Sequence, residues 1–409
     1  MEGFGAVRKG GPPPGFEPRP GPSRRNIDAP PGPYNTGGRA GEFAGVVQPD
    51  PTMSGPKLNI DAAKLNAFLG QAVNDMGAAF QTALIMLGER LGLYKAMAGA
   101  GPMSPGELAK KTETDERYVR EWLCAQAASG YVTFDGASGR FTLPDEQALL
   151  LAVESGPAYL PAAYQIIAST VMDEPQLRDI FRTGFGFGWH QHSACLFDGT
   201  ERFFRPSYAG NLITSWIPSL EGVEAKLRSG ARVADVGCGH GSSTILMAQA
   251  YPKSTFVGFD YHGPSIERAR EKAEQAGVAD RATFEVAASK EYPGSDFDLV
   301  GFFDCLHDMG DPVGAAQHVR SSLKPDGTWL IVEPFAGNRI EDNLNPVGRV
   351  FYAASAMICT PASRSQEVGL ALGAQAGEAK LREVVTQGGF THFRRATETP
   401  FNLVLEAKP

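Results

Sequence analysis

Apolar residues first recur at regular intervals between positions 58 and 97. Leu65, Phe68 and Leu69 begin a run whose spacings of three and four residues are those of one face of a helix. A second run of the same kind covers 83–97. The start of this region is therefore predicted to be helical.

The next segment has the signals of shorter elements. The Ser-Pro-Gly-Glu sequence at 104–107 places a capping residue, a first-turn proline and a glutamate where a capped helix begins. Another helix is expected over 115–130, and two short strands, 131–134 and 140–143, surround a turn that contains glycine. Helices followed by a hairpin predict a mainly α winged-helix domain over 58–150.

From residue 231 onward, short apolar runs alternate with helical runs. This alternation predicts an α/β fold with a doubly wound, mainly parallel sheet. Ligands of such sheets bind beyond the carboxyl ends of the strands, so the residues that follow each strand are candidates for the site. The expected strands are 232–236, 255–259, 283–286, 297–303 and 328–332.

The intervening stretch, 151–230, is unusually aromatic, and most of its rings are expected in a core. Within it, 184–190 has three glycines between large side chains, and such a backbone can move while its rings cover an apolar ligand. A lid and an ordinary packed loop both explain this pattern. His192 and Cys195 lie nearby, but no partner set completes a metal site. A lid would offer acceptor contacts from Phe185, Phe187, Trp189 and His190.

Residues 1–57 are rich in glycine and proline and have no apolar periodicity. No buried core would offset the entropy of ordering them, so we expect a disordered tail. The composition changes around Met53. This leaves two explanations open, which are translation from Met53 and a functional tail.

Composition narrows the classes of protein. The 409 residues carry a net charge of −8, and the segment 58–150 has eight basic and eleven acidic residues. Neither the whole chain nor this segment has the excess of positive charge that is typical of nucleic-acid-binding proteins. No run approaches the roughly 20 apolar residues of a membrane helix, and the N-terminus lacks a signal-peptide pattern. Five scattered cysteines without a CxxC pair favour reduced thiols. We therefore expect a cytoplasmic protein that binds neither nucleic acid nor membrane.

A glycine-rich turn follows the first of the alternating strands. Gly237, Gly239 and Gly241 come after the acidic Asp235, and such glycines let the backbone lie directly against a ligand. A dinucleotide fingerprint would place its third glycine at Ser242. The observed spacing instead resembles the first motif of class I S-adenosylmethionine-dependent methyltransferases. The resemblance implies a Rossmann-like, seven-stranded sheet with S-adenosylmethionine as cofactor, whose amino acid end Asp235 and the glycine backbone would hold.

Other strand ends supply further candidate cofactor contacts. Asp260 ends the second strand, where a carboxylate can accept hydrogen bonds from both ribose hydroxyls, although NAD enzymes and a helix cap also explain an acid here. His262 follows and could stack on adenine. The family usually offers an aspartate to adenine after the third strand; here that carboxylate is absent, which leaves Ser289 or backbone groups. Asp304, after the fourth strand, completes the predicted set.

The sequence Leu-His-Asp at 306–308 resembles the Leu-His-Asp-Trp signature of plant-type and bacterial small-molecule O-methyltransferases, with Met309 replacing the tryptophan. In those enzymes the histidine is the general base, and a glutamate at the position of Glu333 orients it. A neutral imidazole can remove a hydroxyl proton at neutral pH, and a carboxylate fixes its tautomer. The resemblance implies His307, Glu333 and Asp308 as catalytic residues. The alternative is that His307 and Glu333 merely satisfy one another.

The rest of the chain completes the expected architecture. A metal-dependent mechanism would need a carboxylate cluster after the fifth strand, which is absent there, so no metal is expected. In this family an insertion such as 335–377 forms part of the acceptor pocket, with Tyr352 and Met357 as candidate contacts, and 393–397 with 402–406 match the closing hairpin. The expected divisions are a tail at 1–57, the winged helix at 58–150, a connector at 151–230 and the cofactor domain at 231–409.

The resemblance as a whole implies a homodimeric methyltransferase that acts on a hydroxyl of a small-molecule acceptor. Two other functions remain open. A catalytically silent cofactor-binding protein or a transcriptional regulator could use the same scaffold. An NAD-dependent oxidoreductase is disfavoured by Ser242 and by the lack of a suitably placed Tyr-x-x-x-Lys pair.

Overall fold

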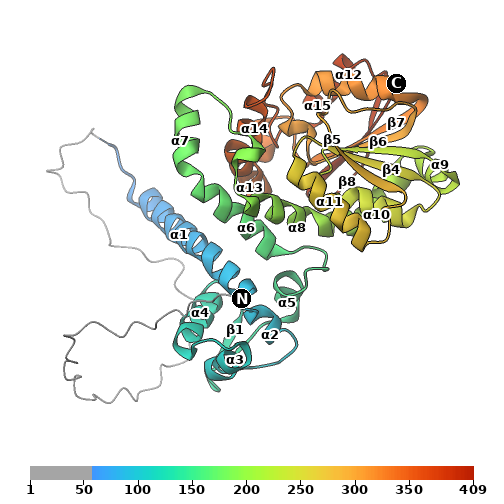
Figure 1. Ribbon diagram of the computed structural model, residues 1–409. Helices are drawn as coiled ribbons and strands as arrows, with labels where there is room; N and C mark the ends of the chain where they lie inside the picture. The colour runs from blue at the N-terminus through green and yellow to red at the C-terminus, as the bar shows by residue number, and fades with distance from the viewer. Residues whose placement is uncertain (1–57) are drawn as a thin grey trace, which may run out of the picture.

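The computed structural model describes residues 58–409, so the predicted disorder of 1–57 lies outside the described part of the chain. A long N-terminal helix leads into a small, mainly helical domain, and connector helices join it to a large domain that contains the main sheet (Figure 1). Within 58–409, no helix combines the length and the apolar run that crossing a bilayer requires.

The N-terminal domain has the predicted winged helix-turn-helix elements. The Ser104 hydroxyl accepts from the backbone N–H of Glu107, whose carboxylate accepts from the backbone N–H of Ser104. This is the predicted capping box at the start of the third helix. The elements are α1 (Ala62–Arg90), α2 (Leu93–Met97), α3 (Pro105–Thr112), α4 (Glu116–Ala128), β1 (Thr133–Asp135), β2 (Arg140–Thr142) and α5 (Asp145–Leu151).

Helix α1 is one continuous helix of 29 residues, longer than the first predicted run. Its later part packs on the small domain, where Ile85 is buried and the Trp122 indole N–H donates to the carbonyl of Leu84. Its earlier part is different, because Phe68 and Phe80 are 66% and 77% exposed. Much of the apolar face that the sequence pattern predicted is therefore left exposed by the rest of the described chain.

The connector consists of helices that run from the small domain to the sheet. Arg202 on the longest of them donates to Glu89, Glu154 and Gln165, which ties this helix to α1 and to the start of the connector. The elements are α6 (Leu160–Met172), α7 (Glu174–Thr183), η1 (Trp189–Gln191), α8 (Ala194–Asn211), η2 (Leu212–Trp216), η3 (Ile217–Ser219) and α9 (Val223–Ser229).

The large domain is a seven-stranded sheet in the order β5-β4-β3-β6-β7-β9-β8. Strands β3 to β7 pair in parallel, and β9 is antiparallel to both β7 and β8. The order reverses between β3 and β6, the place where such sheets bind ligands. The strands are β3 (Arg232–Val236), β4 (Thr255–Asp260), β5 (Ala282–Val286), β6 (Phe297–Phe303), β7 (Leu323–Pro334), β8 (His392–Glu398) and β9 (Asn402–Lys408).

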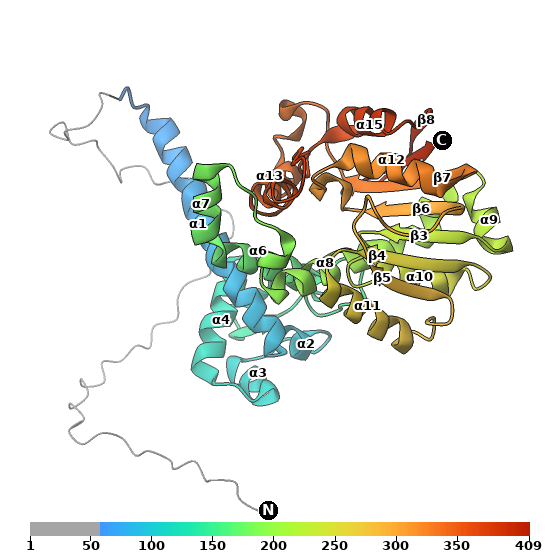
Figure 2. The same ribbon diagram turned by 45° about the horizontal axis from the view of Figure 1, so that its top comes forward.

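Helices cover both faces of this sheet, as predicted for a doubly wound fold (Figure 2). One core contains residues of α10 and α11, and a second core on the opposite face contains residues of α12 and α15. The insertion after β7 forms short helices that lie between α15 and the connector helices in Figure 2. The helices are α10 (Ser242–Ala250), α11 (Gly263–Gln275), η4 (Leu306–Asp308), α12 (Pro312–Ser322), η5 (Ile340–Asn343), α13 (Pro346–Ala354), η6 (Ser355–Cys359), α14 (Thr360–Arg364) and α15 (Gly377–Gln387).

Candidate active site

The predicted glycine turn joins β3 to α10 at the point where the strand order reverses. Gly237, Gly239 and Gly241 have φ angles of 76°, 51° and 78°, in the left-handed region that favours glycine. A Cβ on Gly241 would lie 2.7 Å from the ring of Phe284, whereas one on Gly239 would meet nothing within 4 Å. Gly241 is therefore fixed by packing, and Gly239 leaves open backbone against which a ligand can lie.

Asp235 lies beneath this turn and is almost fully buried. Its Oδ2 accepts from the hydroxyls of Ser243 and Thr244 at 2.6 and 2.5 Å, which fixes the first turn of α10. Burial raises the pKa of Asp235 to about 6, against the opposing effect of these two hydroxyls. Its buried Oδ1 has no hydrogen-bond partner in the described chain.

Asp260 at the end of β4 is bonded to the backbone by both carboxylate oxygens. Oδ2 accepts from the N–H of Gly239 at 3.0 Å and Oδ1 from the N–H of His262 at 2.9 Å. Each oxygen keeps a second lone pair, so the carboxylate can still accept from a ligand hydroxyl. The His262 ring, which was predicted to stack on adenine, stacks on Phe197 of α8 with centroids 4.3 Å apart.

The other two predicted cofactor residues have different surroundings. Ser289 is half-buried in the loop after β5. Asp304 has both oxygens engaged, one by the Tyr208 hydroxyl at 2.9 Å and one by the Asn402 amide at 3.0 Å. Burial, reinforced by the charge of Glu333, raises the pKa of Asp304 to about 7. Direct cofactor contact by Ser289 or Asp304 stays a prediction.

His307 and Glu333 are in contact, as the sequence predicted. His307 Nδ1 and Glu333 Oε2 are 2.5 Å apart, and Glu333 Oε1 accepts from the N–H of Leu306 at 2.9 Å. Both side chains are nearly inaccessible to solvent. His307 Nε2 lies 3.1 Å from Asp308 Oδ1, which places the imidazole between two carboxylates.

The two carboxylates change the protonation of His307. Burial alone would lower its pKa, but the charges of Glu333 and Asp308 outweigh burial and hold the pKa well above its usual range. The imidazole is therefore harder to deprotonate here than a free histidine side chain, and its role as general base stays a prediction. Burial raises the pKa of the neighbouring Cys359 thiol to about 12. Ligand atoms of His307, Asp308 and Cys359 all lie within 4.8 Å of one another, but the expectation of no metal stays a prediction.

The segment 184–190 packs against the insertion and against Asp308. The Trp189 indole N–H donates to Asp308 Oδ2 at 2.9 Å, and the Phe187 N–H donates to the carbonyl of Pro361 at 2.9 Å. Trp189 also packs in a small apolar cluster with Cys359 and Met357. Two candidate acceptor residues, Trp189 and Met357, therefore lie near the group formed by His307, Asp308 and Cys359.

The remaining candidate acceptor residues vary in exposure. Phe187 is buried and its ring meets His192 edge-on, with centroids 4.5 Å apart. Phe185 is 74% exposed and His190 is also exposed, so neither faces a closed cavity. Tyr352 is half-buried on α13. Acceptor contact by these four residues stays a prediction.

Sequence reasoning missed the residues that α8 brings to the site. Glu201 Oε1 accepts from the Ser242 hydroxyl at 2.6 Å, directly after the glycine turn, and Tyr208 bonds to Asp304. The signal that could have found them is the spacing of Phe197, Glu201, Phe204 and Tyr208, which repeats at three and four residues and mixes polar with aromatic side chains.

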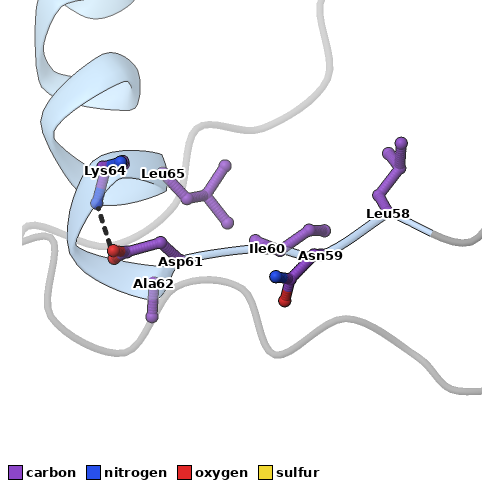
Figure 3. Close-up of a pocket in the computed structure, with 7 residues that line it drawn as sticks. All are labelled: Leu58, Asn59, Ile60, Asp61, Ala62, Lys64 and Leu65. Atoms are coloured by element: carbon purple, nitrogen blue, oxygen red, sulfur yellow. Dashed lines mark hydrogen bonds between the residues drawn. The ribbon is translucent and has the colours of Figure 1, made fainter.

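A surface hollow at the start of α1 is separate from this site (Figure 3). Asp61 in this hollow caps the helix, accepting from the N–H groups of Ala63 and Lys64. In Figure 1 this end of α1 points away from the sheet. The hollow is lined by Leu58, Asn59, Ile60, Asp61, Ala62, Lys64 and Leu65.

Two family comparisons agree with this geometry. Residues 79–153 match the Rv2258c-like winged HTH domain family, and residues 227–383 match a methyltransferase domain family. The chain carries a winged-helix domain and a methyltransferase domain. The predicted resemblance to class I methyltransferases with an N-terminal winged helix is confirmed, and so is the predicted α/β fold class.

Individual curated proteins match this chain over about a quarter of its length. It is 37% identical over 103 residues to 27-O-demethylrifamycin SV methyltransferase of Amycolatopsis mediterranei (strain S699), which is 25% of this chain and 38% of that protein. It is 31% identical over 110 residues to demethylmenaquinone methyltransferase of Lactiplantibacillus plantarum (strain ATCC BAA-793 / NCIMB 8826 / WCFS1), which is 26% of this chain and 46% of that protein. The chain therefore spans less than half the length of these curated relatives.

Solved structures resemble almost the whole described chain. Mitomycin 7-O-methyltransferase aligns with a TM-score of 0.60 at 20% identity, over 85% of this chain and 99% of that one. Human N-acetylserotonin methyltransferase, solved with S-adenosylmethionine, aligns with a TM-score of 0.59 at 16% identity, over 86% and 98%. At these identities the likeness establishes the fold of the methyltransferase and winged-helix domains.

Proposed function

We propose that this chain is an S-adenosylmethionine-dependent methyltransferase that methylates a hydroxyl group of a small molecule, with His307 as general base. The observation that carries the proposal is the buried His307–Glu333 pair. His307 comes just after β6 and Glu333 is near the end of β7, at the same sheet edge as the glycine turn. The O-methyltransferase activities named for the rifamycin and mitomycin enzymes support a hydroxyl acceptor.

The residues at the glycine turn fit the proposed cofactor. Gly239 has open space where a side chain would stand, and Asp260 has lone pairs left for the ribose hydroxyls. The unpartnered Oδ1 of Asp235 is a buried acceptor beneath the turn, as an ammonium group requires. We therefore propose Asp260 for the ribose, the glycine backbone with Asp235 for the amino acid end, and His262 with Ser289 for the adenine.

In this proposal S-adenosylmethionine, when bound, supplies an electrophilic methyl group. Glu333 holds the Nδ1–H of His307, so that Nε2 is the nitrogen that receives the proton of the acceptor hydroxyl. In the described structure Asp308 lies at Nε2, so the hydroxyl has to enter beside Asp308. Glu333 then stabilises the imidazolium that the transfer leaves.

Cofactor binding and acceptor use are tested separately. Calorimetric titration of the full chain with S-adenosylhomocysteine is expected to give saturable binding at one site per chain, whereas NAD is expected not to bind. A panel of hydroxylated aromatic compounds with radiolabelled S-adenosylmethionine then tests the acceptor. Absence of binding to both S-adenosylmethionine and S-adenosylhomocysteine would contradict the proposed function.

The pH dependence of methyl transfer is predicted to report His307. Because the base needs an unprotonated Nε2 and its pKa is raised by Glu333 and Asp308, the rate should increase with pH and level off only well above pH 6.5. Asp308→Asn removes one of the two charges, so the rising limb should move to lower pH. A limb at the same pH in both proteins, measured at saturating cofactor, would mean that Asp308 does not act on His307.

The exposed apolar face of α1 supports the predicted homodimer. Phe68, Met76 and Phe80 are more than half exposed, and such continuous apolar faces usually pack against another surface. We therefore propose that two copies meet through α1.

The five free cysteines also support the predicted cytoplasmic location, because thiols stay reduced there.

A charge on this face is predicted to disrupt the dimer. Phe80→Glu places a carboxylate in the proposed interface, where burying it unpaired is costly, so the variant should be monomeric at micromolar concentration while the wild type is dimeric. Light scattering coupled to size exclusion measures both. A matched Tyr118→Glu variant alters an 80% exposed ring on α4 and should leave the mass unchanged; a monomeric wild type would refute the dimer.

A further inference from the structure

One face of α8 contacts the ends of three strands of the sheet. Phe197 stacks on His262 after β4, Glu201 binds Ser242 after the glycine turn that follows β3, and Tyr208 binds Asp304 after β6. Spacings of four and seven residues put these side chains on the same side of a helix. The helix thus lies across the carboxyl edge of the sheet, between the sheet and the rest of the connector (Figure 2).

Glu201 is the charged member of this face, and its side chain is only 10% exposed. The same carboxylate oxygen accepts from the Ser242 hydroxyl at 2.6 Å and lies 2.9 Å from Lys272 Nζ on α11 and 3.2 Å from Arg205 Nε. Burial alone would raise the pKa of Glu201, but the bond from Ser242 and the charge of Lys272 hold it below its usual range. A largely buried anion therefore joins the connector to both α10 and α11.

Phe197 extends this contact toward the acceptor side. The Phe197 ring stacks on His262, and the centroid of the Trp189 ring lies 5.5 Å from that of Phe197. Trp189 in turn donates to Asp308, which lies against His307. A continuous series of contacts thus runs from the strand end at Asp260 through α8 to the segment 184–190.

We propose that Glu201 is a positioning residue for cofactor binding, and that α8 transmits cofactor binding to the segment 184–190. The inference rests on the proposed function, since it concerns the S-adenosylmethionine site. Glu201 fixes Ser242, the first residue of α10, and thereby the backbone of the glycine turn that the cofactor would contact. Binding there stabilises the position of α8, and the Phe197–Trp189 contact then orders the segment beside His307. The acceptor site is completed after the cofactor has bound.

The test uses the full chain and S-adenosylhomocysteine as the probe. Glu201→Ala and Ser242→Ala each remove the same hydrogen bond from one side, so each should weaken binding by about ten-fold, as expected for a charge-assisted bond. The double variant should be no weaker than Glu201→Ala. Glu201→Gln keeps an oxygen that accepts from Ser242 and should recover most of the affinity. Asp198→Ala truncates an exposed carboxylate one turn earlier on α8 and should bind like the wild type.

A second measurement separates positioning from a merely structural role. Hydrogen exchange of 184–191 should slow when S-adenosylhomocysteine is added to the wild type, and this protection should be lost in Glu201→Ala and Ser242→Ala. Affinities within two-fold of wild type in both variants, or equal protection of 184–191 in all proteins, would overturn the inference. If the wild type itself fails to bind S-adenosylhomocysteine, the proposed function fails instead.

Discussion

Replacing His307 with alanine is expected to lower the rate of methyl transfer by about two to four orders of magnitude, the usual contribution of a general base. The affinity for S-adenosylhomocysteine should stay close to that of the wild type, because the ring nitrogens of His307 are engaged by Glu333 and Asp308. Single-turnover assays with labelled cofactor and an acceptor found by screening measure the rate, and calorimetry measures the affinity.

The variant Glu333→Gln tests whether His307 is the base by changing which ring nitrogen of His307 carries the proton. The amide oxygen can still accept from the N–H of Leu306, but the amide NH₂ then faces His307 Nδ1 and donates to it. The ring proton moves to Nε2, which can no longer accept from a hydroxyl, so a comparable loss is expected. His392→Ala changes an exposed histidine on β8 and serves as the control. Wild-type rates in both the His307 and Glu333 variants would refute the assignment of the base.

The second large effect is expected on cofactor affinity. Both Asp260 oxygens accept from backbone N–H groups, of Gly239 and of His262. Asp260→Asn must direct an NH₂ group at one of these donors, which leaves two donors facing each other in a half-buried place. The glycine turn loses an anchor and the ribose loses an acceptor. We expect binding of S-adenosylhomocysteine to weaken by about 100-fold, which is about 2.7 kcal/mol.

The matched control is Asp280→Asn, which makes the same change at an exposed carboxylate of the same domain. Asp280 is paired with Arg281 at the surface, and such pairs contribute little. Its affinity and melting temperature should equal those of the wild type. Asp260 also holds the backbone of the glycine turn. The melting temperatures of Asp260→Asn and of the wild type, both measured without ligand, therefore show whether the variant is still folded. Unchanged affinity in a folded Asp260→Asn protein would exclude the proposed ribose contact.

The sheet and the edge that carries the site could be predicted from the sequence because their signals are local. The run 297–303 is a strand with the predicted bounds, and the glycine turn begins where β3 ends. His307 and Glu333 meet because the carboxyl ends of neighbouring parallel strands lie together. The order of the strands in the sheet, which the sequence analysis did not predict, then decides which of these residues are neighbours.

Other parts of the site depend on contacts that no local pattern specifies. Ser242 and Glu201 are 41 residues apart, and Trp189 reaches Asp308 across 119 residues. The raised pKa of His307 could not be predicted for the same reason, since the effect of Asp308 depends on the direction of its side chain in η4. The helical period of α1 was predicted correctly, but a period cannot tell whether an apolar face is covered by the same chain.

The position of β9 has a consequence for synthesis of the protein. This last strand lies between β7 and β8 in the sheet, pairing with both, and its Asn402 holds the carboxylate of Asp304. The sheet therefore cannot close on the ribosome until the whole of β9, through Lys408, has been synthesised and has left the exit tunnel. A premature stop codon a few residues upstream of β9 would remove an interior strand, leave β7 with an unpaired edge and β8 without its partner, and expose the product to aggregation.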